Sequence, residues 1–314
     1  VPVLTGFPIS VALFASGIGT IIYSCITRFK VPVYLGSSFA YISAVQIAVA
    51  AMSGDVSAAQ TGLILIGLVY VVVSILVRFI GKDWIDKLLP PIVIGPMIAV
   101  IGLGLAANAV GNAGFVTGGD WKVMLTAVFT FILTALISTK AKGFFKIIPF
   151  LCGILGGYVF ALALGIVDFA PMQEVLQSGK FLSLPEFILP IAVPGFKSYH
   201  LYFGPETFAI LPVALVTISE HIGDHTVLGK ICGRNFLKEP GLDKTLMGDG
   251  IATMVAGFLG GPANTTYGEN TGVLAVTKNY NPVTLRIAAV FAIIISFFGI
   301  FTAFLGSIPG AVMG

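Results

Sequence analysis

The stretch GGPANTTYGEN, residues 260–270, interrupts a segment that is otherwise apolar enough to cross a membrane. Glycine and proline weaken a helix, whereas Thr and Tyr favour extended backbone. A second interruption of this kind, PVYLGSSFAYIS, occupies residues 32–43 and combines Pro, Gly and Ser. Each stretch predicts extended backbone that leads into a short helix.

Irregular backbone at membrane depth leaves N–H and C=O groups without helical partners. It is tolerated only where protein or a water-filled cavity covers it. The two extended stretches could pair with each other and so satisfy both backbones. Interrupted spans in two halves of one chain indicate a transporter site built on inverted repeats. The alternative is that each stretch is a tight loop between helices.

The composition excludes most other classes of protein. Of the 314 residues, 57% are hydrophobic and only 10% are charged, and the mean hydropathy is +1.01. A soluble domain carries about 25% charged residues, and a disordered chain lacks so much apolar surface. Cys25, Cys152 and Cys232 are too few and too scattered for a disulfide scaffold or a zinc site. The net charge of +3 is small, and the sequence contains no basic tract that would bind nucleic acid. The chain is therefore predicted to be an all-α polytopic membrane protein.

A helix needs about 20 apolar residues to cross a bilayer core. The candidate spans are residues 9–27, 32–51, 58–80, 91–110, 122–139, 147–166, 205–227, 246–260, 264–277 and 283–305. Residues 168–204 form the longest polar interval and are expected to be an external loop or an interfacial segment. The apolar text at residues 1–4 and 308–314 predicts a fragment whose first and last spans are incomplete.

Basic residues favour cytoplasmic loops, and here they divide unevenly between the two sets of alternating loops. The smaller set holds Lys122, Lys180 and Lys197. The larger set holds the other fourteen of the 17 basic residues, which are Arg28, Lys30, Arg78, Lys82, Lys87, Lys140, Lys142, Lys146, Lys230, Arg234, Lys238, Lys244, Lys278 and Arg286. The larger set is therefore predicted to be cytoplasmic.

Two carboxylates stand inside the predicted spans. Glu220 lies deep in one span, and Glu269 lies at the break of a later one. A charge at the bilayer centre costs at least about 2.5–3.5 kcal/mol, and no Lys or Arg is close in sequence to either residue. Burial favours the protonated carboxyl. A carboxyl that can change its charge is what proton coupling requires.

Asp224 follows Glu220 by four residues and therefore shares its helical face. His221 and His225 are also four residues apart, on a neighbouring face. The order EHIGDH, residues 220–225, matches neither HExxH nor its inverse. No metal site is therefore expected, and the His pair is interpreted as lying at a helix end near the cytoplasm.

The stretch ENTGVLAVTK, residues 269–278, resembles the signature of the nucleobase–ascorbate transporter family, also called the second nucleobase–cation symporter family. Every fixed position of that signature matches. The wider text NTTYGENTGVLAVTK, with VPVYLGSSFAYIS at residues 31–43 and SEHIG at residues 219–223, is similar to the bacterial uracil-transporting branch. The resemblance extends over essentially the whole chain.

The resemblance implies a transporter with two inverted repeats of seven spans, arranged as a core domain and a gate domain, with two short extended segments in broken spans. On that map the chain begins at the end of span 1 and stops at the entry to span 12. The implied domain limits are 1–87 for the core of the first repeat, 88–167 for the gate of the first repeat, 168–204 for an external loop, 205–305 for the core of the second repeat and 306–314 for the start of its gate.

The resemblance also implies site residues. Glu220 and Glu269 match the two glutamates that bind uracil. Phe39 and Gly268 match positions whose backbone faces the base, and Tyr267 lies beside them. The family therefore implies a substrate site formed by these five residues.

Proton coupling is implied for Glu220, Asp224 and Glu269. Asp224 departs from the family, because the best-known uracil transporter has a His at that position. An Asp there could take a proton itself, or it could hold Glu220 through a shared proton.

The chemistry of uracil fits these residues. Its ring N–H groups can donate to a carboxylate, and its carbonyls can accept from backbone N–H groups at helix starts, where the helix dipole is positive. Phe39 and Tyr41 could stack on the ring, although aromatic residues in spans more often serve packing.

The function expected from these observations is proton-coupled uracil import across the cell membrane. No cofactor and no enzymatic activity are expected, and the partners are uracil, a proton, membrane lipid and, by family, a second copy of the chain. The alternatives are a xanthine or purine permease, a membrane-embedded hydrolase that uses Glu220 and the His pair, and an anion carrier of similar architecture. Glu269 argues against the anion carrier.

Overall fold

The computed structural model describes residues 1–81, 84 and 91–313. It contains two compact units, and each is described by itself. The first unit comprises residues 1–101 and 182–298, and the second comprises residues 102–181 and 299–314.

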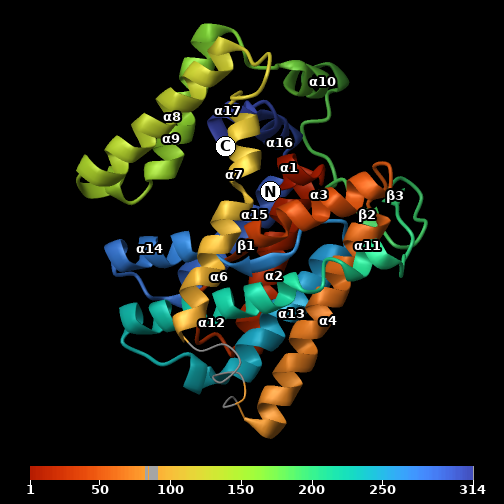
Figure 1. Ribbon diagram of the computed structural model, residues 1–314, viewed down its shortest axis with the longest axis vertical. Coiled ribbons are helices and arrows are strands. Elements are labelled where there is room, and N and C mark those ends of the chain that lie inside the picture. The colour runs from red at the N-terminus through yellow and green to blue at the C-terminus, as the bar shows by residue number, and fades with distance from the viewer. Residues whose placement is uncertain (82–83, 85–90, 314) are drawn as a thin grey trace. The chain divides into compact units, whose positions relative to one another are not determined.

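The first unit is built mostly of helices, with two short pairs of strands (Figure 1). In chain order its elements are α1 (Pro2–Thr5), α2 (Ile9–Ile26), β1 (Leu35–Ser37), η1 (Phe39–Tyr41), α3 (Ile42–Ala51), α4 (Ser57–Ile80), most of α6 (Pro91–Gly104), β2 (Ile188–Leu189), β3 (Lys197–Ser198), α11 (Pro205–Phe208), α12 (Val213–Cys232), η3 (Leu237–Gly241), α13 (Leu242–Phe258), β4 (Asn264–Thr266), α14 (Gly268–Thr277) and α15 (Pro282–Ser296).

The two interrupted stretches pair with each other. Strand β1 lies antiparallel to β4, with Gly36 opposite Thr265, and all six strand residues are buried. The pairing continues at both ends, where Ser38 N–H donates to Ala263 O at 2.9 Å and Tyr267 N–H donates to Tyr34 O at 3.3 Å. The prediction that the two stretches pair is confirmed, and the alternative of two separate tight loops is wrong.

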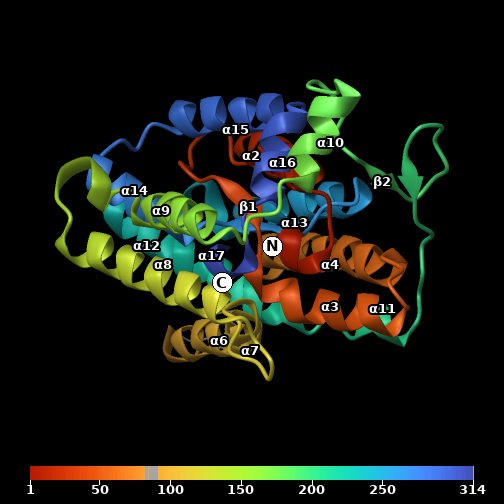
Figure 2. The same ribbon diagram turned by 90° about the horizontal axis from the view of Figure 1, so that it is seen from above.

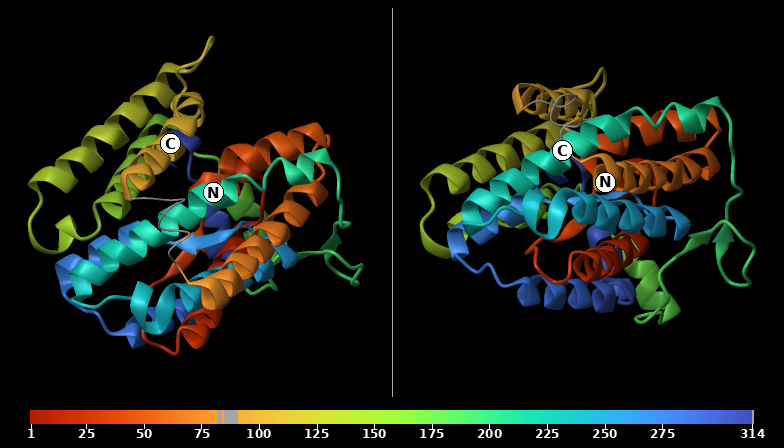
Figure 3. Two further views of the ribbon diagram at one scale, coloured as in Figure 1. Left: turned by 60° about the horizontal axis from the view of Figure 1, so that its bottom comes forward. Right: turned by 90° about the horizontal axis from the view of Figure 1, so that it is seen from below.

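The same order of elements occurs on both sides of this strand pair. A long helix, a strand, a short helix and a second long helix form α2–β1–α3–α4 in the first half and α13–β4–α14–α15 in the second. Helix α4 packs along α13, and α15 packs along α2. Figure 2 shows α2 beside α15, and Figure 3 shows the orange helix α4 beside the blue helix α13. In this order α2 corresponds to α13 and α4 corresponds to α15. The contact between α4 and α13 therefore corresponds to the contact between α15 and α2.

Small residues allow these helices to approach closely. A Cβ on Gly67 of α4 would lie 2.5 Å from the carbonyl oxygen of Gly250 on α13, and a Cβ on Gly250 would lie 2.7 Å from Gly67 O. A Cβ on Gly17 of α2 would lie 2.6 Å from Ala289 O on α15. Packing through small residues is the usual contact between membrane helices, since lipid supplies no hydrophobic driving force.

Asn264 connects the strand pair to the surrounding helices. Its side-chain amide donates to Ala15 O on α2 at 3.0 Å and to Ala252 O on α13 at 3.3 Å. Thr253 Oγ1 donates to the backbone oxygen of Asn264 at 2.9 Å. The strands are therefore held by side chains as well as by their own ladder.

The second unit is also helical. Its elements are the end of α6, α7 (Ala106–Asn112), α8 (Trp121–Lys140), η2 (Gly143–Lys146), α9 (Pro149–Leu164), α10 (Ala170–Ser178), α16 (Gly299–Gly306) and α17 (Gly310–Met313). Helices α8 and α9 pack side by side (Figures 1 and 2). A small buried cluster forms where Tyr158 and Ala161 of α9 meet Val312 of α17.

Several helices are shorter than the membrane spans that the sequence predicts, or divide one predicted span between them. In the part of the chain that the structure describes, three helices are long and apolar enough to cross a membrane, namely Ile9–Ile26, Ser57–Ile80 and Trp121–Lys140. The expected span 283–305 is divided between α15 and α16, and the expected span 91–110 is divided between α6 and α7. The polar interval 168–204 contains the helix α10.

The compact units divide the chain after Ile101, Phe181 and Phe298. The expected limit between residues 87 and 88 lies outside the described residues, as do Lys82, Lys87, Asp83 and Asp86. The assignment of core and gate domains stays a prediction.

Replacing Gly67 with Val should separate α4 from α13, because the new side chain meets the backbone of Gly250. Overpacking of this kind costs about 1–3 kcal/mol, so we expect a lower melting temperature in detergent. Gly102→Ala is the matched control, since a Cβ there would meet nothing within 4 Å. Equal melting temperatures for both variants would contradict the close helix contact.

Candidate substrate-binding site in the first unit

One face of α12 carries the polar groups of the site. Thr217, Glu220 and Asp224 follow one another at spacings of three and four residues and so share a face. Thr217 is fully buried, whereas Glu220 and Asp224 are half-buried. The broken spans contact this face from η1 on one side and from β4 and α14 on the other. The two segments that interrupt the spans therefore meet at the carboxylates of α12.

Two hydrogen bonds fix this arrangement. The hydroxyl of Tyr41 in η1 lies 2.6 Å from Thr217 Oγ1, and Thr266 Oγ1 of β4 donates to Asp224 Oδ2 at 2.7 Å. Gly268 lies next to Asp224, since a Cβ on this glycine would be 3.6 Å from Asp224 Oδ1. Tyr41 is buried, and its hydroxyl is engaged by Thr217.

The helix that follows β4 begins without a side-chain cap. Tyr267 is the residue before α14, and no side chain accepts a hydrogen bond from the first turn. The first backbone N–H groups of a helix have no partner within the helix. The N–H groups at Gly268 and Glu269 are therefore available to an acceptor, and the helix dipole adds positive potential there. The helical turn η1 likewise has no side-chain cap at Ser38.

The expected site residues differ in exposure. Phe39 is 46% exposed, and Gly268 and Glu269 are exposed as well. Tyr267 is half-buried, and its hydroxyl donates to Ser37 O at 3.3 Å. Sequence reasoning expected both glutamates to be shielded from water. Glu220 is half-buried, whereas Glu269 is exposed because it lies in the first turn of α14, after the buried strand β4.

Glu220 carries an unpartnered oxygen. Its Oε2 atom is buried and has no hydrogen-bond partner among the described residues. Asp224 follows Glu220 by one turn on the same face of α12. A buried polar atom without a partner costs free energy, so this oxygen is placed to accept from a ligand donor or to hold a proton.

A fully buried polar network lies behind Glu220. His221 Nδ1 is 2.9 Å from Asp249 Oδ2 of α13, and their side chains are 0% and 1% exposed. The His225 ring contacts the Tyr23 hydroxyl of α2 through Nε2, and its Nδ1 is 2.8 Å from His221 O. Because a carbonyl oxygen only accepts, Nδ1 of a neutral His225 carries the proton and Nε2 accepts from Tyr23.

This network corrects the interpretation of the His pair. Both rings lie in the middle of α12, which continues to Cys232, and not at a helix end. The rings are stacked, with centroids 4.1 Å apart. Among the described residues, no group of three or more His, Cys, Asp or Glu side chains is arranged to hold a metal ion. The His pair instead connects α12 to α13 and α2.

Asp249 is the residue that sequence reasoning missed. It lies in the apolar span LMGDGIATMV, residues 246–255, with a glycine on each side. A carboxyl inside such a span is the same signal that singled out Glu220. Its partner was not recognisable, because His221 is 28 residues earlier in the chain.

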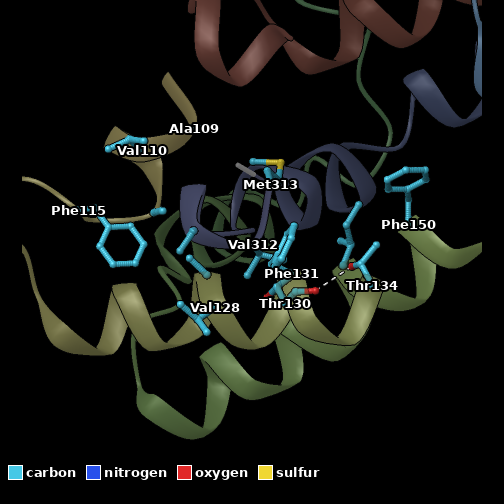
Figure 4. A pocket seen from close by; sticks show the side chains of 14 residues that line it. Ala109, Val110, Phe115, Val128, Thr130, Phe131, Thr134, Phe150, Val312 and Met313 are labelled. Atoms are coloured by element: carbon cyan, nitrogen blue, oxygen red, sulfur yellow. Dashed lines mark hydrogen bonds between the residues drawn. The ribbon is translucent and has the colours of Figure 1, made fainter. Parts of the chain in front are cut away.

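A cavity of about 500 Å³ lies in the second unit. Its lining includes Val110, Phe131, Phe150 and Met313, and it contains no ionisable side chain (Figure 4). The hydroxyl of Thr134 donates to Thr130 O at 2.8 Å within its own helix. This cavity lacks the charged or free polar groups that a polar ring would need, so it is no candidate for the substrate site.

Comparison with known proteins gives the family. A sequence model described as the permease family matches residues 2–314. The chain is 46% identical over 319 residues to a uracil permease of Bacillus caldolyticus, with 100% of this chain and 71% of the relative covered. It is 44% identical over 322 residues to the uracil permease of Bacillus subtilis (strain 168), with 100% and 71% covered. The chain belongs to the nucleobase–ascorbate transporter family.

Other comparisons agree with this assignment. The permease is 38% identical over 318 residues to the uracil permease of Escherichia coli (strain K12), with 100% of this chain and 70% of the relative covered. These relatives are named permeases, so the chain is a membrane-embedded transporter and not an enzyme. The resemblance inferred from the motifs is confirmed. The hydrolase alternative is therefore wrong.

A solved structure shows the same fold. The transmembrane domain of a cyanobacterium bicarbonate transporter, BicA, matches with a TM-score of 0.62 at 15% identity. The match covers 99% of this chain and 83% of that chain. The predicted helical transporter class is confirmed.

The His221→Ala variant of the permease should be less stable, because it leaves the buried Asp249 carboxyl without its partner. Breaking a buried pair on one side costs about 3–5 kcal/mol. Tyr23→Phe removes one hydrogen bond to His225 and should cost about 1 kcal/mol. Thermal unfolding in detergent measures both. A loss for Tyr23→Phe as large as that for His221→Ala would contradict this ranking.

Proposed function

We propose that this permease imports uracil together with a proton across the cell membrane, an inner or plasma membrane that it spans several times. The observation that carries the proposal is the unpartnered, buried Oε2 of Glu220. It lies on the helix face that both broken spans contact. The names of the relatives support uracil as the substrate.

The site supplies both kinds of group that a pyrimidine ring requires. Uracil donates from two ring N–H groups and accepts at two carbonyls. In our proposal, the carboxylates of Glu220 and Glu269 accept from the ring N–H groups, and the uncapped N–H groups at Gly268 and near Phe39 donate to the carbonyls. Phe39 and Tyr267 provide apolar contact beside the ring. A site of this kind rejects analogues that leave its polar groups unpaired.

Proton coupling is proposed for Glu220, Asp224 and Glu269. Asp224 lies one turn from Glu220 on the same helix face, and a carboxylate beside another carboxylate disfavours a further negative charge. A proton taken up by one of these three carboxyls would reduce the repulsion among their negative charges when the base binds. Thr266, which donates to Asp224, connects the protonation of this group to the strand pair.

Alternating access is proposed between a core domain and a gate domain, in a fold of two inverted repeats of seven spans. The exchange of helix contacts between the two halves of the first unit supports the inverted repeats. The domain limits proposed are 1–87 and 205–305 for the core, 88–167 and 306–314 for the gate, with 168–204 as an external loop. Membrane lipid and a second copy of the chain are the further proposed partners.

The second candidate within the family is a xanthine or purine permease. The names of the similar proteins, which are uracil permeases, disfavour it. Competition of unlabelled uracil and unlabelled xanthine against radiolabelled uracil uptake separates the two candidates.

Glu220→Ala should abolish uracil binding, because it removes the acceptor for a ring N–H group. Glu220→Gln should weaken binding at least about tenfold, since a hydrogen bond to a charged group contributes about 1.5–3 kcal/mol. Equilibrium binding of radiolabelled uracil to the purified protein measures this. Glu174→Ala, which removes an exposed carboxylate in α10, is the control and should bind as the parent does. Full binding by Glu220→Ala would remove Glu220 from the site.

Uptake of uracil should fall as the external pH rises, because a lower proton concentration outside reduces the driving force for import. A protonophore should abolish accumulation. Proteoliposomes with and without an imposed pH gradient measure both effects. Uptake that follows a sodium gradient instead would contradict the proton coupling.

A further inference from the structure

We propose that the turn after α2 and the start of α15 form a binding site for the headgroup of an anionic phospholipid. The site consists of Arg28, Phe29 and Arg286, and the acyl chains lie along the exposed apolar stripe of α15. This proposal concerns the surface of the first unit and does not depend on the identity of the transported base.

Arg286 is held in place by an aromatic ring. Its guanidinium carbon lies 4.6 Å from the centroid of the Phe29 ring, in the range of a cation–π contact. Phe29 is 47% exposed. Its backbone and that of Arg28 have positive φ angles of 58° and 54°. This turn keeps a large apolar ring at the surface, where Arg286 packs against it.

Neither Arg28 nor Arg286 has a carboxylate partner in the part of the chain that the structure describes. Within the described residues, no acidic oxygen lies within 4 Å of either guanidinium, whereas Lys30 in the same turn is paired with Glu239 of η3. The Nε–H group of Arg286 is buried and donates to no acceptor among the described residues. The stacked guanidinium therefore carries a positive charge that an outside anion can neutralise.

An apolar surface continues directly from Arg286. The exposed side chains of α15 recur along one side of the helix, at Val283, Ile287, Val290, Phe291 and Ile294. Val283 precedes Arg286 by three residues and Val290 follows it by four, so both flank the arginine on the helix surface. A charged group beside an exposed apolar stripe matches the charged headgroup and apolar chains of a phospholipid.

Charge and the neighbouring apolar stripe favour a lipid over a soluble anion. Arg28 and Arg286 belong to the set of basic residues that the loop count predicts to be cytoplasmic. The cytoplasmic leaflet carries anionic lipids, and each basic residue near its surface adds about 1 kcal/mol of attraction. Arginine also binds phosphate in a bidentate manner. A free phosphate would use the arginines but would leave the apolar stripe without a role.

Native mass spectrometry of the purified full chain, with equimolar phosphatidylglycerol and phosphatidylcholine of the same chain length, tests the proposal. The parent protein should retain phosphatidylglycerol in preference. Arg286→Gln and Arg28→Gln should each lower the affinity for phosphatidylglycerol about fivefold. Lys30→Gln is the matched control from the same turn, and it should change the affinity little because Glu239 already offsets its charge.

Four results would overturn the proposal. One is equal retention of both lipids by the parent protein. Another is an affinity for phosphatidylglycerol that neither arginine variant changes. A third is a loss of affinity in Lys30→Gln as large as in the arginine variants. The fourth is full displacement of the lipid by inorganic phosphate, which would assign the arginines to a soluble anion. Melting temperatures of the variants show whether a loss comes from misfolding, and the two arginine variants test the same site independently.

Discussion

The hydrogen bonds between β1 and β4 are the constraint on which the first unit depends. Two apolar spans are broken by Gly, Pro and polar residues, and their backbone groups have no helical partners at those places. Each unpaired buried group would cost several kcal/mol in lipid. The antiparallel pair satisfies them, with Asn264 supplying further bonds to α2 and α13. The helices around the strand pair must pack closely to cover it. Gly67 and Gly250 permit the close contact between α4 and α13.

The same pairing creates the candidate site. Each strand passes directly into a short helical segment, so two uncapped helix starts lie beside the strand pair. Helix α12 contacts both and brings Glu220 and Asp224 to them. Groups that donate and groups that accept are thereby concentrated within a small region of the unit. Any base that binds there must satisfy both, which is the physical basis of selectivity at such a site.

The position of α12 is itself held from behind. The His221–Asp249 pair fastens it to α13, and the His225–Tyr23 contact fastens it to α2. The network thus supports the site without itself facing the proposed ligand.

The resemblance and the membrane class were predictable, because both rest on local text, namely ENTGVLAVTK at residues 269–278 and long apolar segments. The choice of Glu220 was also predictable, since a carboxyl within a span stands out by composition alone. The lengths of the helices were not. The segment 283–305 is apolar throughout, and only tertiary contacts divide it between α15 and α16.

By itself, the sequence determined that two spans are broken, that both breaks are extended and that polar residues occur beside them. Only the tertiary structure decided which distant groups meet: that Asp249 is the partner of His221, that the hydroxyl of Tyr41 is hydrogen-bonded to Thr217, and that Glu269 is exposed while Glu220 is half-buried. The reason is that backbone preference and hydropathy are local properties of a few neighbouring residues. Hydrogen-bond partners and burial depend on the packing of helices that are far apart along the chain.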